Sequence, residues 1–138
     1  MQYLNRNLFP ALLLAVFLFG TLKVKSADPI DSLTIRIEQA GEDTNKVNLL
    51  RALAIHHLTV TGEYDQAILY YNKMIELSKN IDYPYGVARA YKGIGNTYLV
   101  QGDFYLAVDN YYEAWGIARE NNLRRTESTL INNIGLLY

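Results

Sequence analysis

ARAYKGIGNTYLVQGDFYLAVDNYYEAWGIARENNLRRTE, residues 88–127, decides the fold because its key residues recur at an interval of forty positions. The matched pairs are Gly62 and Gly102, Tyr64 and Phe104, Ala67 and Ala107, Tyr71 and Tyr111, Ile94 and Ile134, Gly95 and Gly135, and Tyr98 and Tyr138. A fixed interval of about twenty to fifty residues is typical of stacked structural units. The sequence therefore predicts a chain of similar repeats.

The small residues of this stretch indicate what each repeat is. Gly95 and Ala107 lack bulk, which lets two antiparallel helices approach at the short end of the usual interaxial range. Gly102 stands where a left-handed residue ends the first helix, and Asp103 is placed to cap the second. We therefore predict a tight helical hairpin in which Gly95 and Ala107 mark the point of closest approach.

The same residues resemble the tetratricopeptide repeat. Residues 88–127 match its pattern at Tyr91, Ile94, Gly95 and Tyr98 in a first helix, at Gly102 and Phe104 in the turn, and at Ala107, Tyr111 and Ala114 in a second helix. The final proline of the pattern is missing. The resemblance implies an all-α fold, a right-handed superhelix (solenoid) of antiparallel helix hairpins.

The expected organisation has five parts. They are a signal peptide at residues 1–26, an N-terminal capping helix and linker at 27–47, an atypical first repeat at 48–87, a second repeat at 88–127, and the truncated first helix of a third repeat at 128–138. The first repeat departs from the family pattern at Arg51, where a bulky apolar residue is usual, at Ile55 and at Met74. Asp43 or Thr44 is expected to cap its first helix.

The N-terminal segment indicates export. Arg6 precedes an uncharged run from Leu8 to Leu22, which is too short to cross a hydrocarbon core of about 30 Å comfortably. We expect cleavage between Ser26 and Ala27; the alternative is an uncleaved anchor. Either outcome predicts an extracytoplasmic chain, periplasmic or secreted, that contacts a membrane only through this segment or through further C-terminal sequence.

Composition argues against several functions. The formal net charge is −1, so no basic surface for nucleic acid is expected. The absence of cysteine removes disulfides, thiol nucleophiles and cysteine-based zinc sites. The only histidines, His56 and His57, are adjacent and cannot clamp a metal as an i, i+4 pair can; we expect both at the surface or in a groove. We predict no cofactor, no metal and no active site in these residues.

The resemblance places ligand contacts on the first helices, which line the concave side of the superhelix. The candidate binding residues are His56, Arg89, Lys92, Asn96, Leu99, Asn132 and Asn133, with Leu49, Ala52, Thr59, Val60, Val100, Thr129 and Leu136 at the remaining contact positions. Lys92, Asn96 and Asn133 also resemble part of the clamp by which some members of the family hold a C-terminal carboxylate. The alternative for the asparagines is hydrogen bonding between neighbouring helices.

These patterns predict a scaffold that binds a protein or peptide. The layout resembles the N-terminal sensory regions of bacterial membrane-bound signalling proteins, which include histidine kinases, nucleotide cyclases and helix-turn-helix regulators. One alternative is that the stretch is the input region of a full-length enzyme, namely a sensor histidine kinase. A second alternative is an oligomerisation scaffold that only associates with itself.

Overall fold

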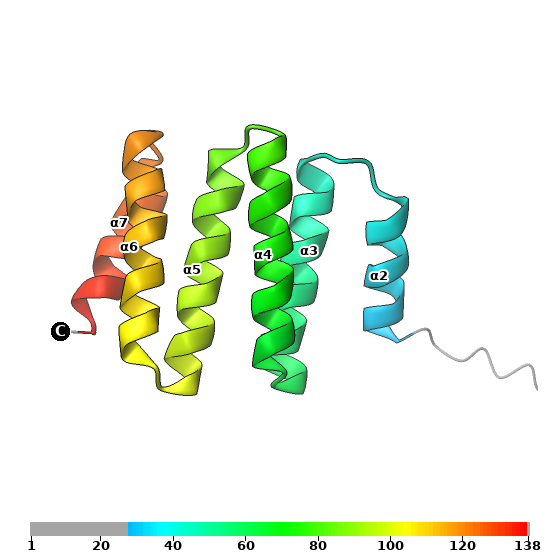
Figure 1. Ribbon diagram of the computed structural model, residues 1–138, viewed down its shortest axis with the longest axis horizontal. Coiled ribbons are helices and arrows are strands. Elements are labelled where there is room, and N and C mark those ends of the chain that lie inside the picture. The colour runs from blue at the N-terminus through cyan, green and yellow to red at the C-terminus, as the bar shows by residue number, and fades with distance from the viewer. Residues whose placement is uncertain (1–27, 138) are drawn as a thin grey trace, which may run out of the picture.

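The computed structural model describes residues 28–137, and their regular structure is entirely helical (Figure 1). Six α-helices and one π-helical turn follow one another, and no strand occurs among these residues. The predicted signal peptide and Tyr138 lie outside the described part of the chain. The expectation of an all-α fold is confirmed for residues 28–137.

The helices from α3 onward begin at regular intervals. The elements are α2 (Pro29–Gln39), α3 (Thr44–His56), the π-helix η1 (His57–Thr61), α4 (Tyr64–Asn80), α5 (Pro84–Gln101), α6 (Phe104–Glu120) and α7 (Arg124–Gly135). From Thr44 onward each α-helix begins twenty residues after the previous one. The forty-residue interval of the sequence therefore recurs in the backbone as pairs of helices.

Each of the four turns from α3 to α7 contains one residue with a positive φ. These residues are Gly62 (69°), Asp82 (52°), Gly102 (83°) and Asn122 (56°). Glycine reaches this region without a Cβ clash, and Asp and Asn are the side chains that tolerate it best. The prediction for Gly102 is confirmed. Among these four residues, Asp82 and Asn122 are forty positions apart, as Gly62 and Gly102 are.

Aspartates cap three of the helices. The Asp43 side chain accepts a hydrogen bond from the Lys46 amide at 3.0 Å, so Asp43 and not Thr44 is the cap of α3. Asp103 does the same for α6, accepting from the Leu106 amide at 3.0 Å. Asp28 caps α2 through the Ile30 amide. Such a cap satisfies one of the amides that the first helical turn leaves unpaired.

The helices pack in the order of the chain and form two layers. Figure 1 shows them in a row from α2 at one end to α6 and α7 at the other, with α3 behind α4 and α7 behind α6. Beyond the consecutive pairs, α3 contacts α5, and α5 contacts α7. Because the turns from α3 to α7 are two or three residues long, neighbouring helices there run antiparallel. Helices α3, α5 and α7 therefore occupy one layer.

The predicted close approach occurs at Gly95. A Cβ there would lie 2.6 Å from the Tyr111 ring and 3.1 Å from the Ala107 carbonyl oxygen, closer than side chains normally come. Ala107 and Tyr111 are both buried on α6. The prediction that Gly95 and Ala107 mark the contact of two paired helices is confirmed. Gly93 has a similar role toward α4, since a Cβ at Gly93 would overlap the Tyr71 ring.

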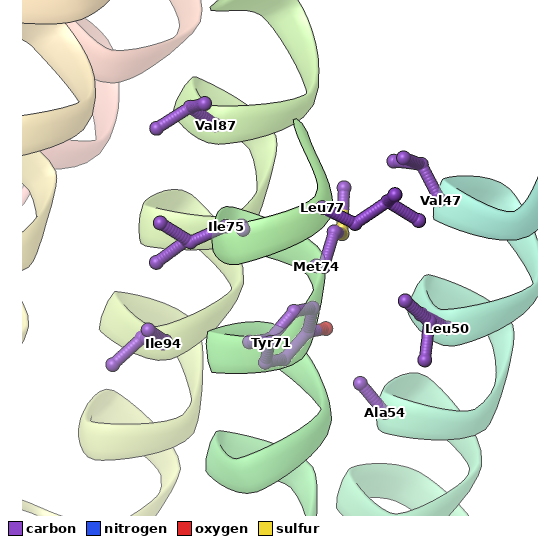
Figure 2. Packing of buried hydrophobic residues seen from close by; sticks show 10 residues of the cluster. Val47, Leu50, Ala54, Tyr71, Met74, Ile75, Leu77, Val87 and Ile94 are labelled. Carbon is purple, nitrogen blue, oxygen red and sulfur yellow. The ribbon is translucent and has the colours of Figure 1, made fainter. Parts of the chain in front are cut away.

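Two clusters of buried side chains make up the core. The first joins α3, α4 and α5, and Figure 2 shows members from each of these helices, Leu50, Tyr71 and Ile94. The second joins α6 and α7 around Tyr111 and Leu130, with Tyr91 and Tyr98 packed against both clusters. Each hairpin thus buries its apolar side against the next one, as stacked units do.

The predicted N-terminal helix forms as α2 but is loosely packed. It contains no buried residue; Ile30, Leu33 and Ile37 are half-buried, and Ile37 contacts the first core cluster. A helix that buries so little apolar surface gains little stability from its packing. We therefore expect α2 to contribute least to the stability of the described fold.

Candidate binding face

The predicted binding residues lie on the three helices of one layer. His56 is on α3, the residues Arg89, Lys92, Asn96 and Leu99 are on α5, and Asn132 and Asn133 are on α7. Asn132 is exposed and the other six are half-buried. We call the layer formed by α3, α5 and α7, with these side chains, the first-helix face. Of the further contact positions, Leu49 is buried and is not available to a ligand.

A hydrogen bond joins α3 and α5 across this face. One Arg89 guanidinium nitrogen donates to the Asn48 side-chain oxygen at 3.4 Å, and the same guanidinium lies 5.0 Å from the centre of the Tyr85 ring. A cation over an aromatic face is attracted by the ring electrons. Two contacts therefore hold Arg89 in a defined position.

Lys92 lies one helical turn from Arg89 and is half-buried. Burial lowers the pKa of its ammonium group below the ordinary value, and the charges of Arg51 on α3 and Arg89 on α5 lower that pKa further. The three cations are thus close enough to repel one another. Sequence reasoning treated Arg51 as a departure from a packing pattern and did not include it in the site.

Asn96 is engaged by the core. Its side-chain oxygen accepts a hydrogen bond of 2.7 Å from the Tyr111 hydroxyl, whose pKa burial raises. This bond joins α5 to α6 within one hairpin. It favours the interpretation of Asn96 as a structural asparagine, although its amide nitrogen still faces no partner among residues 28–137. The grouping of Lys92, Asn96 and Asn133 as a clamp stays a prediction.

The two histidines have different environments. His56 is half-buried, and its Nδ1 has no hydrogen-bond partner within residues 28–137. His57 is buried: its ring stacks on Tyr70 with centroids 5.3 Å apart, and its Nδ1 lies 2.8 Å from a Glu63 carboxylate oxygen. The expectation of a surface or groove position is wrong for His57, because the π-turn η1 directs its ring into the contact with α4.

Two hollows lie away from the first-helix face. A groove of about 370 Å³ between α2, α3 and α4 has apolar walls that include Ile37, Leu50 and Leu53 and charged side chains at its edge. A shallow depression on α6 is lined by Phe104, Tyr105, Val108, Asp109 and Tyr112. Neither was predicted from the sequence, since both depend on how helices or aromatic side chains are spaced in the fold.

The described residues lack two other kinds of site. Within residues 28–137 no three His, Asp or Glu side chains gather in a way that could hold a metal ion, and none of the helices α2 to α7 is long and apolar enough to cross a membrane. No protein-family model matches the chain, and no curated protein matches it. The comparisons therefore supply no functional assignment.

Proposed function

We propose that this chain is a tetratricopeptide-type scaffold, a right-handed superhelix of helix hairpins, that binds another protein or a peptide on its first-helix face. The observation that carries the proposal is the regular backbone: helices that begin twenty residues apart, each joined to the next through one left-handed residue. Such repeats present a continuous surface built from one helix of every hairpin.

The chemistry of the first-helix face suits an extended peptide. Arg89, Lys92 and the amide of Asn132 are hydrogen-bond donors that reach solvent at least in part, and peptide carbonyl and carboxylate oxygens are acceptors. The side chains come from helices that pack on one another, so little conformational freedom is lost on binding. A scaffold of this kind recognises a partner without changing it chemically.

Peptide display against the full chain tests this function. We expect enriched peptides that bind with saturable affinity when synthesised and that shift the amide resonances of α3, α5 and α7 in NMR spectra. Asn132→Arg should weaken binding about tenfold by blocking the face, while Asn72→Arg, the same change on the exposed side of α4, should not. Shifts confined to α4 and α6, or equal effects of the two variants, would contradict the proposal.

We further propose that the chain acts outside the cytoplasm as the sensory or interaction region of a bacterial signalling protein. The support is the uncharged run from Leu8 to Leu22 after Arg6 and the resemblance described above. Mass spectrometry of the exported product should give an N-terminus at Ala27. An intact product that remains in the cytoplasm would exclude this location.

One observation favours the alternative of an oligomerisation scaffold. Phe104 and Tyr105 at the start of α6 are 59% and 81% exposed, and large exposed aromatic side chains are common at protein interfaces. Light scattering of the full chain separates the two functions. A monomer that binds selected peptides supports the peptide scaffold, whereas a stable dimer that Tyr105→Glu dissociates supports self-association.

A further inference from the structure

One side of α6 carries a group of exposed aromatic side chains. Phe104, Tyr105 and Tyr112 are 59%, 81% and 46% exposed. Together with Val108 and Asp109 they line the depression on this helix, which has a volume of about 410 Å³. We call these five residues the α6 patch. Helix α6 lies in front of α7 in Figure 1, and the α6 patch shares no residue with the first-helix face.

The matching side of α4 is polar at two of these positions. Tyr105 and Tyr112 stand forty residues after Asp65 and Asn72, and both of these polar side chains are exposed. One hairpin is therefore built without aromatic rings where the other has them, so the fold itself does not explain the rings of α6. Exposed apolar patches commonly mark the sites of interaction with another molecule.

The size of the α6 patch favours a short ligand over a second copy of the chain. A fully covered aromatic side chain buries about 150–250 Å², so the exposed parts of Phe104, Tyr105 and Tyr112 amount to roughly 300–450 Å². A stable dimer buries about 800 Å² on each partner. The patch provides about half of that area, which is enough for a short extended segment.

The backbone of α6 restricts the conformation of that segment. The amides and carbonyls from Val108 to Tyr112 bond within the helix, so they offer no partners to an added strand. A polyproline II segment needs no such partners, because its backbone stays solvated and proline has no amide hydrogen. Proline rings can therefore cover aromatic side chains without leaving unpaired donors buried.

The spacing and charge of the α6 patch fit a proline-rich segment with a basic residue. Tyr105 and Tyr112 are seven residues apart, which is about 10.5 Å along a helix. Polyproline II repeats every three residues, or about 9.3 Å, so the prolines of a P-x-x-P sequence have nearly the same separation. Asp109 lies between the two tyrosines on their side of the helix and forms no ion pair within residues 28–137.

We propose that the α6 patch binds a proline-rich segment of a partner protein in the polyproline II conformation, with an arginine or lysine of that segment at Asp109. The proline rings pack against the aromatic side chains, and the basic side chain pairs with the carboxylate. This goes beyond the proposed function, because it gives the chain a second binding surface that does not depend on the ligand of the first-helix face.

Tryptophan fluorescence of the full chain measures this binding without a label. Trp115 is the only tryptophan of the chain, and its ring meets the Tyr112 ring edge to face with centroids 6.4 Å apart. The first of three amidated peptides repeats P-x-x-P, with alanine as x and an arginine at each end. The second has glutamate at each end, and the third has alanine in place of every proline. We expect saturable binding of the first, about tenfold weaker binding of the second and none of the third.

Variants of the α6 patch locate the peptide. Tyr105→Ala should weaken binding of the first peptide at least tenfold, and Tyr105→Phe should retain most of it, because the ring makes the contact. Tyr105 is largely exposed, so neither change should lower the melting temperature. Asp109→Asn should remove most of the preference for arginine over glutamate ends. Tyr85→Ala removes another exposed tyrosine, on α5 in the layer of the first-helix face, and is the control that keeps the affinity.

Several results would overturn the inference. No saturable binding of the first peptide, or equal affinity for the first and the third, would show that proline is not recognised. An equal loss in Tyr85→Ala and Tyr105→Ala would place the peptide elsewhere than on α6. A stable dimer in light scattering that Tyr105→Ala dissociates would mean that a second copy covers the patch. Peptides selected by display for the first-helix face should bind Tyr105→Ala as tightly as the parent, so the two binding surfaces are tested separately.

Discussion

The first hairpin, α3 with η1 and α4, and the second hairpin, α5 with α6, share a backbone plan but close their turns differently. In the second, Asp103 caps α6 through a backbone amide. In the first, Glu63 stands at the matching position and makes no cap bond; its carboxylate accepts from the Thr61 hydroxyl at 2.9 Å and pairs with His57. The longer side chain reaches back to η1, and the turn is held by side chains instead of a helix cap.

The two matching tyrosines also differ in what they contact. Tyr111 lies over Gly95 of its own hairpin, whereas Tyr71 lies against Gly93 of the following hairpin. Ile55 stands forty residues before Gly95, so the first hairpin lacks the gap that Tyr111 fills. The second hairpin is thus closed on itself and the first is tied to its neighbour. Equal spacing in sequence does not ensure equal side-chain contacts.

Filling the gap at Gly95 should have the largest effect. Gly95→Val would force its side chain into the Tyr111 ring and the Ala107 carbonyl, and we expect a loss of about 3 kcal/mol in the free energy of unfolding, measured by urea denaturation. Gly116→Ala, in α6 with open space around the added methyl group, should instead gain up to about 1 kcal/mol. A gain in stability in both variants would mean that helix propensity, not the close approach, determines the result.

We expect the second-largest loss of stability on removing the His57 side chain. His57→Ala removes the stacking on Tyr70 and the contact with Glu63 from a buried position, so we expect a loss of about 2 kcal/mol by chemical denaturation. Asp103→Ala tests the turn of the second hairpin and should cost about 1 kcal/mol, the usual value for a helix cap. If His57→Ala leaves the free energy of unfolding unchanged, side-chain contacts do not hold the turn of the first hairpin.

Tyr111→Phe should cost about 1 kcal/mol at neutral pH, because Asn96 loses its hydrogen bond. Tyr71→Phe should cost less, since no hydrogen bond of its hydroxyl occurs within residues 28–137. Burial raises the pKa of both phenols. A phenol whose pKa is higher in the folded state contributes stability that is fully present below the unfolded pKa of about 10. This stability is lost as the pH rises through the folded-state pKa. Each variant should therefore flatten the alkaline fall in urea stability, and an unchanged alkaline limb would contradict the burial of these hydroxyls.

The smallest effect is expected at acid pH in the first hairpin. The hydrogen bond from Thr61 lowers the pKa of Glu63, and the contact with His57 lowers it further. A lowered carboxyl pKa gives stability that is present above the unfolded value of about 4.5 and is lost as pH falls through the folded value. Glu63→Gln should flatten the acid limb of a melting-temperature profile. Thr61→Val should do so in part; a steeper limb in either variant would argue against this arrangement.

Much of the backbone was predictable from particular residues. Gly95 and Ala107 indicated the helix contact, Gly102 the left-handed turn and Asp103 the cap, because each depends on the size or chemistry of one side chain at a fixed spacing. The alternation of Asp82 and Asn122 with the glycines was present in the sequence but is less distinctive, since Asp and Asn also occur at caps and on exposed helix faces.

The candidate site was predictable only in part. The resemblance to the repeat family placed Arg89 and Lys92 among the expected ligand contacts. It could not bring Arg51 of α3 beside them, because that depends on how two hairpins stack. The burial of His57 was missed for a similar reason, because the π-turn at residues 57–61 changes the direction of the side chain.

The sequence by itself determined that the chain forms helices, where most of them end, and which small residues let them pair, because these properties follow from local conformational preferences and from a period that can be counted. Only the tertiary structure decided which tyrosine meets which glycine, that His57 is buried, and that Arg89 of α5 bonds to Asn48 of α3. These contacts join residues of separate helices, and their free energies depend on distances that no interval along the chain specifies.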